Sequence, residues 1–187
     1  MQNGTFDRNN TPPRALQFYN SFRRLWSEHV NWTRAFIIST AFDLPDLEAN
    51  TVRLLRNPSD FANILRPFYG NVAARRFGQL LTDHLNIIMN IVNAMKAEDF
   101  DNEDILRRDL YNNISELSTY LGELNPNWNP TVWSELLNEH LLMLENASAL
   151  LLRGMYPESI TQFDSIQTEA LRMGDEMAEG LIRQFGI

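Results

Sequence analysis

Three stretches of the sequence repeat one pattern, in which a histidine follows an acidic residue and large apolar residues stand three, four and seven positions before it. The three histidines, His29, His84 and His140, are the only ones in the chain and lie 55 and 56 residues apart. Offsets of three, four and seven place the apolar residues and the histidine on one face of an α-helix. The repeat therefore predicts three long helices, each with a histidine on its buried face.

Helical periodicity continues over almost the whole chain after residue 13, and no stretch alternates like a β-strand. Asn57 and Asn129 each precede a proline and are expected to cap a helix N-terminus. We expect an all-α, up-down helical bundle with short extra helices, in which three hairpins place the histidine-bearing helices parallel. Both gene duplication and shared bundle patterning account for the repeat. The expected helices cover residues 14–42, 46–56, 58–69, 72–96, 104–124, 130–153 and 158–185.

Composition limits the classes of function. The 187 residues fit one domain over 13–187, preceded by an Asn-rich stretch at 1–12 that predicts a flexible tail. A net charge of −8 argues against sequence-independent nucleic-acid binding, and the absence of cysteine excludes disulfides and thiolate metal sites. No apolar run approaches the roughly 18 residues of a membrane span, and no signal-peptide core is present, so a cytoplasmic protein is expected. Homo-oligomerisation stays open.

Three buried imidazoles that converge are suited to hold a transition-metal ion. Histidines alone favour zinc, whereas an added carboxylate favours iron or manganese. Asp164 shares a face with apolar residues of the last helix and is the candidate carboxylate ligand. Asn113 interrupts an apolar stripe and is a candidate supporting residue, because a buried amide needs hydrogen-bond partners.

The acids that precede the histidines, namely Glu28, Asp83 and Glu139, point about 100° away from them on an ideal helix. They are either partners for an imidazole of another helix or part of a solvated flank. The paired ligand motifs Glu-x-x-His and His-x-x-x-His are absent, as are the motifs of hydrolases and zinc proteases.

Three functions are compatible with these residues. The first is a metal-binding bundle that uses the three histidines with Asp164. The second is a non-enzymatic interaction or scaffold module, since a single buried histidine commonly serves only as a core hydrogen-bonding group. The third is a metalloenzyme with an open coordination position for water.

Several segments also resemble a known group of sequences. The stretch from Phe22 to Glu48 resembles small helical proteins of the Bacillus and Clostridium type, and the repeated Glu-His pair is similar to tandem ferritin-like domains of unknown function. The resemblance implies an all-α, ferritin-like bundle in which the three histidines are metal ligands. The missing Glu-x-x-His pairs argue against ferroxidase-type di-iron chemistry. The same group is matched by residues 55–58, 68–70, 125–128 and 162–164.

Overall fold

The chain folds into α-helices connected by short turns. The computed structural model describes residues 13–187, and none of these residues forms a β-strand. This confirms the all-α prediction, while the tail predicted at 1–12 lies outside the described residues. The helices are α1 (Pro13–Ala41), α2 (Leu47–Ala97), α3 (Phe100–Leu124), α4 (Pro130–Leu152) and α5 (Tyr156–Phe185).

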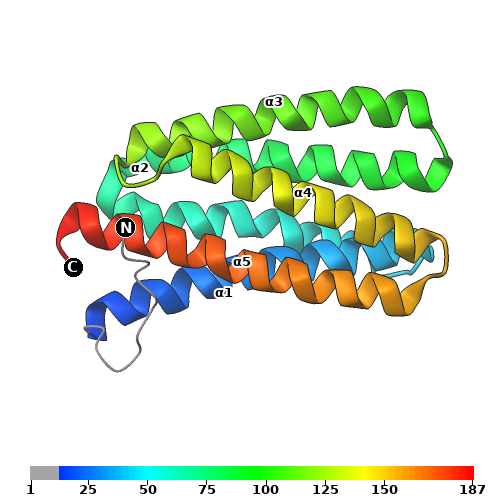
Figure 1. Ribbon diagram of the computed structural model, residues 1–187, viewed down its shortest axis with the longest axis horizontal. Coiled ribbons are helices and arrows are strands. Elements are labelled where there is room, and N and C mark those ends of the chain that lie inside the picture. The colour runs from blue at the N-terminus through cyan, green and yellow to red at the C-terminus, as the bar shows by residue number, and fades with distance from the viewer. Residues whose placement is uncertain (1–12) are drawn as a thin grey trace.

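The helices form three hairpins around a common core. Within α2 the chain reverses at Gly70, whose φ of 80° and ψ of 173° are non-helical and are readily adopted only by glycine. The hairpins are therefore α1 with the first part of α2, the second part of α2 with α3, and α4 with α5 (Figure 1). The first helix of every hairpin runs in the same direction, so the three histidine-bearing helices are parallel (Figure 1).

The break predicted at Asn57 is wrong, because α2 continues through Asn57 and Pro58. The proline cannot donate the hydrogen bond that the carbonyl of Leu54 would receive. The side chain of Asn57 does not cap a helix but is buried against α1. The tertiary hydrogen bonds of Asn57 therefore outweigh the local preference of an Asn-Pro pair for the start of a helix.

Other helix boundaries follow local capping. The side chain of Asn129 accepts a hydrogen bond from the backbone N–H of Thr131, which confirms the predicted cap before Pro130. The helix expected from residue 104 begins at Phe100, because Asp99 caps it by accepting from the N–H of Asn102.

Close packing joins the first and third hairpins. A Cβ atom added at Gly174 of α5 would lie 2.9 Å from the backbone of Arg23 in α1, so the two helices touch at backbone distance. Further along α5, Gly180 leaves room for the indole of the fully buried Trp128, which donates to backbone carbonyls of α5.

Within residues 13–187, no helix has the length and apolar character needed to cross a membrane.

Candidate metal centre

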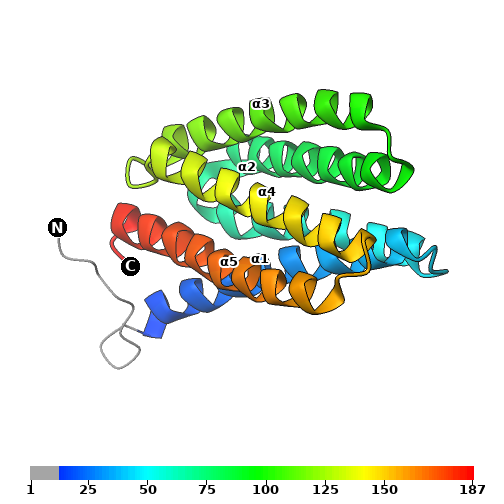
Figure 2. The same ribbon diagram turned by 45° about the vertical axis from the view of Figure 1, so that its right-hand side comes forward.

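The three histidines meet in the middle of the bundle. The ring centroids of His29 and His140 lie 5.9 Å apart, and those of His29 and His84 lie 6.4 Å apart. Each residue is at most 2% exposed. The three rings come from α1, α2 and α4, whose histidine-bearing parts run in the same direction through the bundle (Figure 2). The convergence predicted from the sequence repeat is therefore present for both of these pairs.

Asn57 fixes the orientation of the His29 ring. Its amide nitrogen donates to the carbonyl of Leu25 at 3.0 Å, which turns its Oδ1 towards Nδ1 of His29 at 3.1 Å. An amide oxygen can only accept, so Nδ1 of His29 carries the hydrogen and donates it. In the neutral ring Nε2 is then left with a lone pair.

The second hairpin repeats this arrangement in every detail. The amide nitrogen of Asn113 in α3 donates to the carbonyl of Leu80 at 3.0 Å, and its Oδ1 lies 3.0 Å from Nδ1 of His84. Both accepting carbonyls belong to the residue four positions before the histidine. His84 is accordingly held with its hydrogen on Nδ1 and its Nε2 lone pair free.

The third hairpin uses a carboxyl group in place of the amide. Oε2 of Glu169 in α5 lies 2.9 Å from Nδ1 of His140 and accepts its hydrogen. Oε1 of Glu169 and Nε2 of His140 are both buried and have no hydrogen-bond partner among residues 13–187. Buried polar atoms without partners are rare in folded proteins. Two of the five such side-chain atoms in the described residues belong to this centre, and the others are on Thr40, Arg53 and Trp133.

Burial keeps two of the rings neutral. Desolvation lowers the pKa of His29 to about 3, with further lowering by the neighbouring His140 and His84, against a small rise from Asn57. Desolvation and the proximity of His140 likewise lower the pKa of His84 to about 4. Neutral imidazoles are the form that binds metal ions, and no proton has to leave these two rings at neutral pH.

The carboxylate predicted from the sequence is not at this centre. Asp164 is exposed on α5, where it lies in the electrostatic field of Arg34. An exposed side chain cannot join a cluster that is buried, and the carboxyl group that reaches the histidines is Glu169, five residues further along.

The acids next to the histidines lie at the periphery. Glu28 pairs with Arg24 and Arg53, Asp83 accepts from Gln79, and Glu139 lies 4.0 Å from Arg172. None of these contacts is with an imidazole. The three acids therefore belong to the solvated flank of their helices and are not partners of the histidines.

The three residues that anchor the histidines, namely Asn57, Asn113 and Glu169, stand at similar distances from them in the sequence. Asn57 follows His29 by 28 residues, and Asn113 and Glu169 each follow their histidine by 29. This separation of 28 or 29 residues corresponds to one hairpin, from the histidine to the facing residue of the returning helix. The apolar stripe that it interrupts points to Asn113, the Asn-Pro pair instead predicts a cap at Asn57, and no pattern in the sequence points to Glu169.

The rings are slightly too far apart to share one ion. Imidazoles that bind one zinc ion through Nε2 at about 2 Å have ring centroids about 5 Å apart in tetrahedral geometry. The observed separations of 5.9 and 6.4 Å are larger. Consistent with this, no group of three or more His, Asp or Glu side chains in the described part of the chain is arranged to hold a metal ion as it stands. Coordination of one ion would require the rings to approach by about 1 Å.

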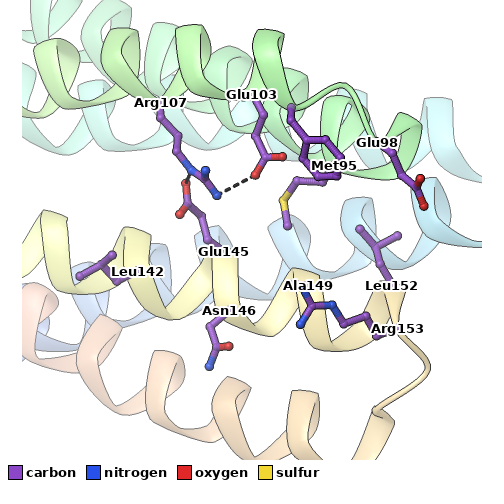
Figure 3. Close-up of a pocket in the computed structure, with 11 residues that line it drawn as sticks. Met95, Glu98, Glu103, Arg107, Leu142, Glu145, Asn146, Ala149, Leu152 and Arg153 are labelled. Carbon is purple, nitrogen blue, oxygen red and sulfur yellow. Dashed lines mark hydrogen bonds and ion pairs between the residues drawn. The ribbon is translucent and has the colours of Figure 1, made fainter.

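A groove opens at some distance from the histidines. The helices α3 and α4 lie close near their connecting loop and diverge towards the opposite end of the bundle (Figure 1). The resulting groove has a volume of about 520 Å³, and no histidine lines it. Arg107 of α3 lies in this groove between Glu103 and Glu145 and pairs with both (Figure 3).

Comparison with protein-family models, with curated proteins and with solved structures finds no match for this chain. The resemblance to small helical and ferritin-like proteins therefore stays a prediction. The geometry of the histidine centre is the basis for any assignment of function.

Proposed function

We propose that this protein binds one divalent transition-metal ion through Nε2 of His29, His84 and His140. The observation that carries the proposal is the orientation of the rings by Asn57 and Asn113. Each amide fixes the hydrogen on Nδ1 and thereby leaves the metal-binding lone pair on Nε2. Histidine ligands in metal sites are held by the same kind of hydrogen bond through the nitrogen that does not bind the metal.

The unpaired Nε2 of His140 supports the same function. A buried imidazole nitrogen without a partner has an unfavourable free energy, and a metal ion among the three rings would satisfy it. Three imidazoles with no carboxylate ligand favour zinc over iron or manganese, and three protein ligands leave a fourth position for water or a small ligand. A binding role in the cytoplasm is compatible with this site, and the fourth position would allow hydrolytic chemistry.

The test combines metal removal with loss of one ligand. Untagged protein, purified without added metal, is analysed for bound metal and then titrated with Zn²⁺ after treatment with a chelator. We expect one ion per chain and a higher unfolding temperature in the presence of Zn²⁺, because an ion that binds only the folded state stabilises it. His84→Ala should bind no zinc, and its unfolding temperature should not respond to the metal.

The exposed Asp164 provides a matched control, since Asp164→Ala should leave stoichiometry and affinity unchanged. The alternative function, a scaffold whose histidines only join helices within each hairpin, predicts a different result. In that case the stability difference between wild type and His84→Ala would be the same with zinc and with chelator. That additivity would exclude the metal site.

A further inference from the structure

The anchoring residue is an amide in the first two hairpins and a carboxylic acid in the third. Asn57 and Asn113 are amides that both accept from a histidine and donate to a backbone carbonyl. Glu169 occupies the equivalent place, 29 residues after His140, and its carboxyl group has no N–H to donate. The equivalent carbonyl in this hairpin is that of Leu136, four residues before His140.

This difference is unfavourable for the fold alone. Glu169 is 4% exposed, and its Oε1 is buried without a hydrogen-bond partner in the part of the chain that the structure describes. A glutamine at this position would keep the oxygen that accepts from His140 and would add the N–H that the other two hairpins direct at their carbonyls. In the number of hydrogen bonds that it can make within the fold, the carboxyl group therefore has no advantage over an amide at this position.

We propose that Glu169 is the positioning residue that sets the affinity and charge preference of the histidine centre for a divalent cation. This inference rests on the proposed metal binding. A carboxylate accepts from the Nδ1 hydrogen of His140 more strongly than an amide does, which makes Nε2 of that ring a better donor to the metal. Its negative charge also attracts a divalent ion more strongly than a monovalent one, and burial reduces screening by solvent.

The test uses Glu169→Gln, which preserves the shape and the acceptor oxygen. Zn²⁺ and Ag⁺ are titrated separately into metal-free protein, and the unfolding temperature of the metal-free protein is measured as well. We expect the dissociation constant for Zn²⁺ to rise about 10- to 100-fold. The constant for Ag⁺ should rise less, and the metal-free variant should unfold at the wild-type temperature or above it. Asp164→Asn, which removes an exposed carboxylate from the same helix, should change neither constant.

A second variant separates the effect of charge from that of local structure. Glu169→Gln combined with Asn57→Asp moves the carboxyl group from the third hairpin to the first, and it should recover most of the lost Zn²⁺ affinity. Because Asn57→Asp also removes the hydrogen bond to the carbonyl of Leu25, the unfolding temperature of the metal-free combined variant is measured as well. If that temperature equals the value for Glu169→Gln and Zn²⁺ binding is no better, a role for the charge is excluded.

The outcomes distinguish this inference from the function on which it rests. Wild-type and Glu169→Gln constants that agree within about twofold would overturn the role of Glu169 and leave the metal site intact. Equal losses for Zn²⁺ and Ag⁺ would overturn the charge preference. Wild-type protein that binds neither ion would remove the proposed function itself, and this result is seen before any variant is made.

Discussion

Asn57 holds His29 by its Oδ1 and holds the helix that carries His29 by its Nδ2. The two hydrogen bonds, 3.1 Å to the imidazole and 3.0 Å to the carbonyl of Leu25, join α2 to two successive turns of α1. A single buried amide therefore fixes the tautomer of the ring and the registry of the first hairpin. The matching pair of Asn113 and His84 does the same for the second hairpin.

Replacing Asn57 by alanine should lower the free energy of unfolding by about 2–4 kcal/mol. The substitution leaves the Nδ1 hydrogen of His29 without an acceptor and creates a cavity in the core. Urea unfolding of metal-free protein measures the effect. Asn93→Ala is the matched control, because Asn93 is exposed on the same helix and bonds only a carbonyl of its own turn. A loss as small as that of the control would show that the amide does not contribute to stability.

Acid should destabilise the metal-free protein below pH 6.5. The pKa values of His29 and His84 are about 3 and about 4 in the folded protein, below the value of 6.5 that each has when unfolded. The unfolded state therefore binds more protons in this range, and stability falls as the pH decreases from 6.5 towards 4. Between pH 7 and pH 5 the two rings together should lower the free energy of unfolding by about 4 kcal/mol.

Carboxylates also titrate over part of this range, so the comparison is made with His84→Gln. That variant retains one of the two rings and should lose about half as much of the histidine contribution, which appears as a shallower dependence on pH. Parallel curves for wild type and variant would contradict the neutral state assigned to His84.

The helices and the buried position of the histidines could be predicted from the sequence, because both depend on the local spacing of apolar residues. Apolar residues three, four and seven positions before each histidine define a buried face, whatever lies opposite. The partners of the histidines come from the returning helices, and their phase depends on the packing of the whole bundle. Asp164 and Glu169 illustrate this dependence, since both are acids on α5 and only Glu169 faces the core.

The break expected at Asn57 has a similar cause. The pair Asn57-Pro58 is a good helix start when judged locally, and tertiary contacts with α1 keep the helix continuous. The break expected between residues 69 and 72 is confirmed, because the chain reverses at Gly70.

Gly180→Ala should destabilise the bundle by about 1–3 kcal/mol. A Cβ atom at this position would overlap the indole of Trp128, which is fully buried and hydrogen-bonded to α5, so the indole would have to move. The better helix propensity of alanine offsets only about 1 kcal/mol of this effect. Gly78→Ala is the control, because its nearest neighbours, Ala62 and Pro58, lie at an ordinary contact distance of 3.4 Å. Thermal unfolding of both variants measures the difference, and equal stability would contradict the close packing of Trp128 on α5.

Arg107 and Glu145 should stabilise the side of the bundle where α3 and α4 diverge. The guanidinium Nε of Arg107 lies 3.0 Å from Oε1 of Glu145 across the groove, and Glu103 holds the same guanidinium at 2.6 Å from its own helix. Because Arg107 is 35% exposed, solvent screens the pair, and a double-mutant cycle with Arg107→Met and Glu145→Gln should give a coupling of about 0.5–1 kcal/mol. Raising the salt concentration to about 1 M should reduce that coupling, since ions screen exposed pairs.

The exposed pair Arg183 and Glu179, which joins neighbouring turns of α5 alone, is the comparison and should show a smaller coupling. Equal couplings for the two pairs would mean that the contact across the groove contributes nothing beyond an ordinary pair on a helix surface.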